Sequence, residues 1–162
     1  MNKQASPFNS ALETGVRALT ILASVFPRSV DLQRLVDFDY LTVHSGDAGG
    51  PESLHASTPM RSGELLVRRQ LIERGLLLMM SRGLIRRVSS PQGIEYVAED
   101  AASPFLKALS SSYLHRLRER ADWVAQNFAE ASDEQLRELT ARFFREWTTQ
   151  FQPVEEKRKG SL

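Results

Sequence analysis

The chain has 162 residues, of which 41% are hydrophobic and 25% charged, and its net charge is +1. This is the composition of an ordinary globular protein. The length is sufficient for one domain and an extension. The chain contains no cysteine, which excludes disulfides, thiol nucleophiles and thiolate zinc sites. It has no run of about 18 apolar residues, and its first ten residues lack the apolar core of a secretory signal. We therefore expect a cytoplasmic protein without a membrane span.

Charge is unevenly distributed along the chain. Residues 61–87 carry seven arginines against Glu64 and Glu73, whereas residues 1–60 carry four basic and six acidic residues. Residues 88–100 carry three acids and no base. The small net charge argues against a strongly basic nucleic-acid binder. The arginine-rich segment indicates either a positive surface or a solvated helix face.

Two helices are predicted in the first third of the chain, after a loose leader over residues 1–8. Ser10 followed by Glu13 has the spacing of a capping box. Apolar residues then recur at helical period until Pro27, which ends the helix. A second, shorter helix is predicted over Asp31–Asp39.

A long loop followed by a third helix is predicted in the middle of the chain. From His44 to Ser62 the chain is rich in glycine, serine and proline, and loops of this length are usually functional or disordered. The third helix is predicted to begin at Ser62 or Gly63 and to run to about Arg82. Its polar side is expected to hold Arg68, Arg69, Gln70, Glu73 and Arg74. Its last segment, GLLLMM, is apolar on all sides, so we expect more than one neighbour to bury it.

A β-hairpin is predicted after Gly83, which ends the third helix. The segments LIRRV and IEYVAE are β-prone and flank the turn SSPQG. Three helices followed by a hairpin are typical of a winged helix-turn-helix protein. We therefore predict a mainly α fold: a winged helix-turn-helix-like domain with a small β-hairpin wing and a two-helix C-terminal extension.

The two helices of the extension are predicted from their start signals. Ser103 before Pro104 predicts the start of one long helix that ends near Phe128. Ser132 and Gln135 have the spacing of a second capping box, which starts the last helix. These signals predict a winged-helix-like domain over 1–100, a helical extension over 101–152 and a disordered tail over 153–162.

The histidines of the middle loop raise the question of a metal or catalytic site. His44, Asp47 and His55 are ligand-type residues, but their spacing matches no compact metal motif and a third convergent ligand is not obvious. The sequence also lacks a nucleophile elbow and a P-loop. We therefore favour hydrogen bonds that hold the loop in shape, with no catalytic residue, no metal and no cofactor.

Arginines at the recognition-helix position raise the question of DNA binding. Arginine suits contacts with phosphates and guanine edges. However, the turn of the wing lacks basic residues, and the strand after it carries Glu95, Glu99 and Asp100, which a phosphate backbone would repel. The candidate contacts with DNA or with a partner are Arg68, Arg69, Arg74, Arg86 and Arg87.

The last helix is unusually aromatic, which favours either core packing or a protein interface. The end of a terminal helix is where a face would be left for a partner. The candidate partner-helix face consists of Phe143, Phe144, Trp147 and Phe151.

Several phrases of the sequence point to a family. DYLTVHSGD, PESLHASTPMRSGELLVRRQLIERGLLLM and GIEYVAE resemble the middle component of ABC-three-component systems, a group that includes Lamassu-type anti-phage systems. The similarity extends from about Leu12 to Phe128. The matching positions include a loop set that we expect to be structural or partner-facing: Tyr40, His44, Asp47, His55 and Arg61.

The resemblance implies a small, non-catalytic, winged-helix-like accessory subunit. Its partners would be a coiled-coil ATPase similar to SMC and Rad50 proteins and a nuclease-type effector, which it would bridge or regulate. The resemblance leaves open a homodimer and a DNA contact through the complex. The alternative from the residues alone is a stand-alone, dimeric winged-helix transcription regulator that binds a palindromic DNA site.

Overall fold

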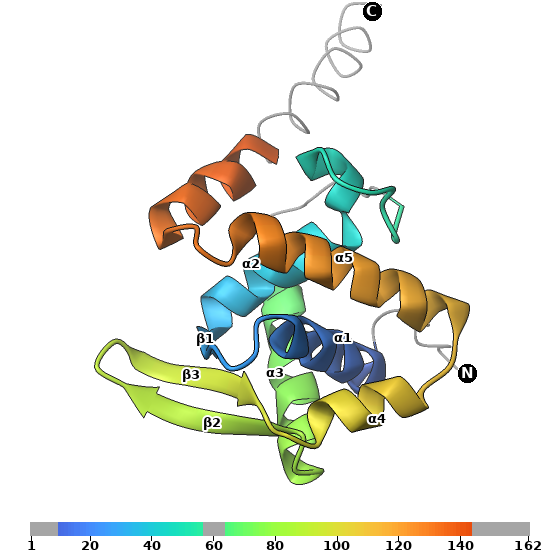
Figure 1. Cartoon of the computed structure of the whole chain (residues 1–162). Helices are drawn as coiled ribbons and strands as arrows, with labels where there is room; N and C mark the ends of the chain where they lie inside the picture. Colours follow the sequence, from blue (N-terminus) through green and yellow to red (C-terminus); the bar gives the residue numbers. More distant parts are fainter. Residues whose placement is uncertain (1–9, 57–63, 144–162) are drawn as a thin grey trace, which may run out of the picture.

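The computed structural model describes residues 10–56 and 64–143 (Figure 1). In this part of the chain a further helix spans 133–143. The other elements, in chain order, are α1 (Ala11–Ser24), β1 (Val30–Asp31), α2 (Leu32–Val43), the 3-10 turn η1 (Ser45–Ala48), α3 (Glu64–Ser81), β2 (Ile85–Ser90), β3 (Gly93–Ala98), α4 (Ala102–Ala108) and α5 (Ser112–Phe128).

The order of these elements confirms the predicted mainly α, winged-helix-like fold. Helices α1, α2 and α3 precede the hairpin of β2 and β3, and the strands of the small antiparallel sheet lie in the order β1-β3-β2. In the wing Ser90 is paired with Gly93, so only two residues form its turn. The two-residue strand β1 was not predicted; it lies directly before α2 and pairs Val30 with Tyr96.

Local signals set the ends of the first three helices. The Ser10 hydroxyl accepts a hydrogen bond from the backbone N–H of Glu13, and Asp31 caps α2 in the same way. Gly83 has a φ of +70° directly after α3, the left-handed conformation that glycine adopts after a helix. Helix α2 continues four residues beyond the predicted Asp39, to Val43, because that last turn is buried on every side.

The long helix predicted from Ser103 to Phe128 is wrong. The structure has two helices there, α4 and α5, separated by Leu109–Ser111. The cap of α5 is Ser111, whose hydroxyl accepts from the backbone N–H of Leu114 at 3.1 Å. Ser103 lies inside α4 and caps nothing, and Pro104 lies in its first turn, where a missing N–H costs no hydrogen bond.

The extension after the wing therefore has three helices among the described residues, one more than predicted. The predicted capping box before the last helix is confirmed: Ser132 and Gln135 exchange two hydrogen bonds, of 2.8 and 3.1 Å. Figure 1 shows α5 in front of α1 and α2, and α3 behind them. Leu106, Val124 and Leu136 from the three extension helices join the same hydrophobic core as α1, α2 and α3.

Helices α1 and α3 cross at a contact between two glycines. A Cβ atom on Gly75 would lie 2.6 Å from the backbone nitrogen of Gly15, and one on Gly15 would lie 2.9 Å from the carbonyl oxygen of Gly75. Real Cβ atoms do not tolerate such distances, so the two backbones can meet only because both residues are glycine. This contact brings α3 against α1.

Some expectations concern residues outside the described ranges. These are the leader over 1–8, the start of α3 at Ser62 or Gly63, the end of the last helix and the tail over 153–162. Among the described residues, no helix is long and apolar enough to cross a membrane.

Candidate functional site

A buried ion-pair network centred on Asp39 joins the first three helices. Asp39 is 1% exposed. Its Oδ1 accepts from Nε of Arg17 at 2.9 Å, and its Oδ2 accepts from Nη1 of Arg68 at 2.5 Å. Burial alone would raise the pKa of Asp39, but the charges and hydrogen bonds of the two arginines lower it below its ordinary value. The network therefore remains ionised at neutral pH.

Arg68, expected on the polar side of its helix, instead points into the protein. Its side chain is 23% exposed and its guanidinium lies 5.6 Å from the centre of the Tyr40 ring. Two of its interactions are thus with buried groups of α2. Contact with a phosphate would require Arg68 to leave Asp39, so the position of the Arg68 side chain indicates a structural role.

The two loop histidines lie beside this network. The buried ring of His44 is 4.8 Å from that of Tyr40, and Nε2 of His55 is 3.0 Å from the hydroxyl of Tyr113 on α5. Burial, together with the charges of nearby arginines, lowers the pKa of both histidines, and the pKa of His55 falls to about 4. Both rings are therefore neutral at pH 7 and available only for neutral hydrogen bonds and packing.

The three metal-ligand candidates are not brought together as a site. His44 is buried, Asp47 is exposed, and the rings of His44 and His55 lie 6.4 Å apart in an edge-to-face arrangement. Within residues 10–56 and 64–143, no group of three or more His, Cys, Asp or Glu side chains could hold a metal ion. Arg61, the remaining member of the predicted loop set, lies outside the described residues.

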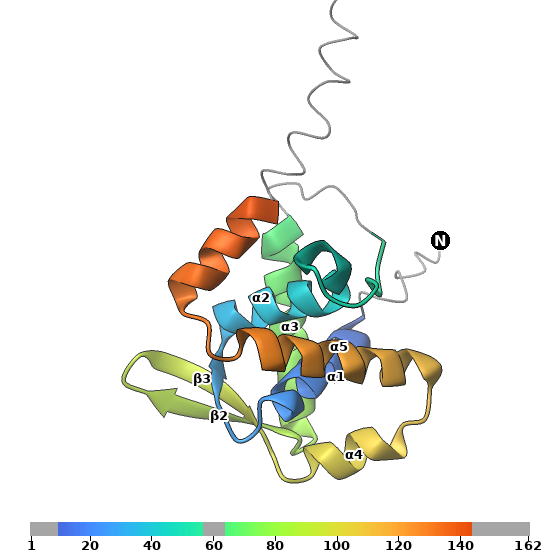
Figure 2. The same ribbon diagram turned by 45° about the horizontal axis from the view of Figure 1, so that its top comes forward.

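Helix α5 holds the loop after α2 in place, and Figure 2 shows the two side by side. Arg120 donates two hydrogen bonds to the carbonyl oxygen of Glu52, at 3.1 and 2.9 Å. The indole of Trp123 lies so close to Gly50 that a Cβ atom there would be 2.4 Å from the ring. The described part of the loop is thus attached to α5 by a hydrogen-bonding arginine and a packed indole.

Sequence reasoning missed Arg120 as a residue that attaches the loop to α5. A signal was present, because a period of 3.6 residues puts Arg120 on the same side of α5 as Tyr113, Leu117 and Val124. An arginine within an apolar stripe indicates a buried partner, which here is a loop carbonyl.

The remaining candidate arginines lie on the surface of α3 and β2. Arg69 contacts Gln33 and Glu73, and Arg86 is 3.1 Å from a carboxylate oxygen of Glu99. The described residues offer no ion-pair partner to Arg74 or Arg87, which are both exposed. Among the described residues, two of these four arginines are thus paired with acids and two are not.

The exposed side of α3 is unexpectedly apolar. Leu66, Val67 and Leu77 are 59%, 54% and 63% exposed. The expectation that neighbours bury the GLLLMM segment on all sides is therefore wrong at Leu77. The rest of the segment packs inward: Leu76 and Met79 are buried, and Leu78 and Met80 are partly buried against the core.

The proposed partner-helix face is only partly within the described residues. Phe143 is buried in the protein's own core, with its ring 5.7 Å from that of Tyr40. The other three members, Phe144, Trp147 and Phe151, lie outside the described residues.

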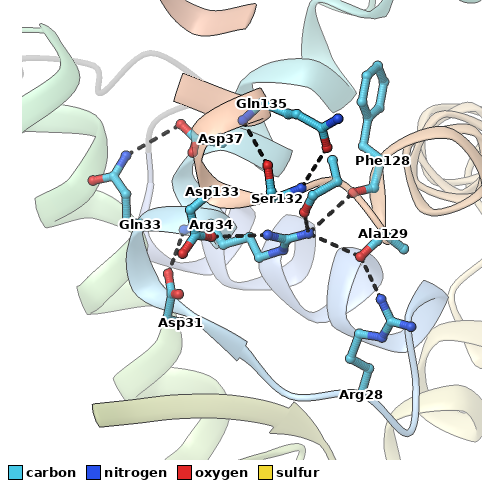
Figure 3. Close-up of polar contacts among 11 residues, drawn as sticks. Arg28, Asp31, Gln33, Arg34, Asp37, Phe128, Ala129, Ser132, Asp133 and Gln135 are labelled. Atoms are coloured by element: carbon cyan, nitrogen blue, oxygen red, sulfur yellow. Dashed lines mark hydrogen bonds and ion pairs between the residues drawn. The ribbon is translucent and has the colours of Figure 1, made fainter. Parts of the chain in front are cut away.

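A second arginine network joins α2 to the end of α5, and no pattern in the sequence predicted it. Figure 3 shows the Arg34 guanidinium pointing at the backbone after α5. It donates to the carbonyl oxygens of Phe128, Ala129 and Ala131 and pairs with Asp133. The last carbonyls of a helix have no partner within the helix and carry partial negative charge, which a cation satisfies. This network fastens α5 and the helix over 133–143 to the winged helix.

Comparison with known proteins identifies one family. A family model described as "ABC-three component (ABC-3C) system Middle Component 2" matches residues 7–150, most of the chain. No curated protein and no solved structure matches the chain.

Proposed function

Because the chain belongs to the middle component 2 family of ABC-three-component systems, we propose that it is a non-catalytic accessory subunit that links the other components. Its direct partner is an SMC/Rad50-like coiled-coil ATPase, and through it the subunit regulates a nuclease-type effector. The setting is anti-phage defence of the Lamassu type.

The observation that supports this proposal most strongly is the apolar character of the outward side of α3. In a winged helix that binds DNA through its recognition helix, the corresponding residues contact base edges and phosphates. Here that side presents Leu66, Val67 and Leu77, while Arg68 is held by Asp39. Exposed leucine and valine side chains suit a protein partner, which removes their apolar surface from water.

A structural role for the middle loop supports the non-catalytic part of the proposal. His55 bonds Tyr113, Arg120 bonds the loop backbone, and both histidines have lowered pKa values through burial. A general acid or base works best when its pKa lies near the working pH. A pKa of about 4 for His55 is poorly matched to that task at pH 7.

The alternative function is that of a stand-alone transcription regulator. Arg74 and Arg87 favour it, because both are exposed without an ion-pair partner among the described residues and lie on α3 and the wing. A regulator of this kind would bind one palindromic sequence far more tightly than mixed DNA, with strong salt dependence.

Co-purification with the components encoded beside its gene tests the proposal. The tagged chain, co-expressed with the ATPase and the effector, should elute with the ATPase as one complex at moderate salt. The matched control is the same tag on an unrelated winged-helix protein. If the chain elutes alone and instead selects a palindromic DNA site, the regulator function replaces the accessory one.

A further inference from the structure

The outward side of α3 forms a stripe that runs the length of the helix. At about 100° per residue, its exposed residues fall within a sector about 120° wide. Leu66 and Leu77 both lie within that sector, about 20° apart around the helix and about 16 Å apart along its axis. The members of this stripe are Leu66, Val67, Gln70, Glu73, Arg74, Leu77 and Ser81.

The opposite side of α3 attaches the helix to the rest of the protein. Ile72, Leu76 and Met79 are buried in the core, and Gly75 meets Gly15 of α1. Figure 1 shows α1 between α5 in front and α3 behind, so α5 does not lie over the stripe. The three apolar side chains of the stripe remain exposed as a result.

The charges around the stripe are mainly positive. Arg74 lies within it and Arg82 follows the end of α3, and both are exposed without an ion-pair partner among the described residues. The stripe's acid, Glu73, lies 4.0 Å from Arg69. A partner that covers the stripe therefore gains from carboxylates placed opposite Arg74 and Arg82.

We propose that this stripe is the docking surface for an acidic amphipathic helix of the ATPase component, an assignment that rests on the proposed function. A helix of at least three turns matches the separation of Leu66 and Leu77 and can pack lengthwise on α3. Its apolar residues cover the leucines and Val67, and its acidic residues face Arg74 and Arg82. DNA fits less well, because a phosphate backbone leaves the three apolar side chains without apolar contacts.

Affinity of the purified ATPase component for variants of the full chain tests the assignment. Leu66→Asp combined with Leu77→Asp should weaken binding by about 30-fold or more, since central apolar contacts carry much of an interface's binding energy. Leu12→Asp is the matched control, because Leu12 of α1 is 58% exposed but lies outside the stripe. It should change affinity less than about 3-fold. Circular dichroism and thermal unfolding should show that all variants fold.

Charge reversal tests the acidic character of the partner helix. Arg74→Glu should weaken binding about 10-fold or more and reduce its salt dependence, whereas Arg74→Lys should retain most of the affinity. Binding of the same variants to a mixed-sequence DNA duplex is measured in parallel.

Each outcome decides between distinct conclusions. If the double leucine variant binds the ATPase like the wild type, the assignment of the stripe is overturned and the proposed function stands. If the wild type binds no ATPase, both are overturned. If Arg74→Glu abolishes duplex binding but leaves ATPase binding unchanged, the stripe is a DNA-binding surface and the assignment fails.

Discussion

Arg17 and Asp39 form an ion pair in the protein interior, with 2.9 Å between Nε and Oδ1, and Arg68 approaches the other carboxylate oxygen. One buried anion thus balances two arginines from different helices. Removing one member of a buried pair leaves a charge that water cannot reach, which costs far more than losing a surface pair.

Asp39→Asn is therefore expected to destabilise the protein by about 3–5 kcal/mol, because Arg17 then remains buried without its counter-ion. Arg68→Ala is expected to cost about 1 kcal/mol, because Arg68 is partly exposed and Asp39 keeps Arg17. Urea unfolding at pH 7 measures both free energies. Equal effects of the two substitutions would contradict a network centred on Asp39 and Arg17.

Asp37 predicts a pH dependence of stability. Burial, with the charge of Asp31 adding to it, raises the pKa of Asp37 to about 6 from 3.8. Because the folded pKa is the higher one, the folded state binds the proton more tightly. Stability from this group is present below about pH 4 and is lost as the pH rises through 6.

The matching experiment uses Asp37→Asn, which cannot acquire a charge. This variant should be more stable than the wild type by about 1–2 kcal/mol at pH 8 and nearly equal to it at pH 4. Urea unfolding at the two pH values measures the difference. If the difference in stability between Asp37→Asn and the wild type is the same at both pH values, Asp37 is not the cause of this pH dependence.

Gly50→Ala is expected to separate the loop from α5, because its Cβ would lie 2.4 Å from the Trp123 indole. Overpacking of this kind costs about 1–3 kcal/mol. Trp123→Leu in the same chain should recover part of that loss. Gly49→Ala is the control: it meets nothing within 4 Å, and its cost of about 1 kcal/mol comes from its positive φ.

A double-mutant cycle distinguishes the two glycines. The cost of Gly50→Ala should depend on residue 123, whereas the cost of Gly49→Ala should not. Additive effects at Gly50 and Trp123 would mean that the indole does not shape the loop.

Arg34→Ala is expected to loosen the helix over 133–143, because it removes the donor shared by Ala129, Ala131 and Asp133. Hydrogen bonds from a charged group are worth about 1.5–3 kcal/mol each at most. We expect faster amide hydrogen exchange over 133–143 than in the wild type.

Arg28→Ala is the control for this prediction, because Arg28 binds the same turn from an exposed position. It should have the smaller effect on exchange. Arg34→Lys should not restore protection, since one ammonium group cannot reach several carbonyls and a carboxylate as the planar guanidinium does. If exchange rates over 133–143 are unchanged in Arg34→Ala, the Arg34 network does not hold this helix in place.

Local chemistry made several elements predictable. Ser10 and Ser132 act as the caps that their spacing to Glu13 and Gln135 indicates, and Gly83 ends α3 as predicted. These signals work because a cap or a left-handed glycine satisfies backbone groups within four residues along the chain. The same locality misled the prediction at Ser103, where Ser-Pro resembles a cap, whereas the long helix begins at Ser112 and is capped by Ser111.

By itself the sequence determined the succession of helices and hairpin, and hence the winged-helix-like fold, together with the resemblance to the middle-component family. Only the tertiary structure decided which charged residues form buried ion pairs. Arg68 and Arg74 are both expected on the polar side of α3, yet Arg68 lies on the side that faces the core and binds Asp39, whereas Arg74, about 120° away around the helix, is exposed. The physical reason is that Asp39 comes from another helix, so its pairing with Arg68 depends on how α2 and α3 pack rather than on local spacing.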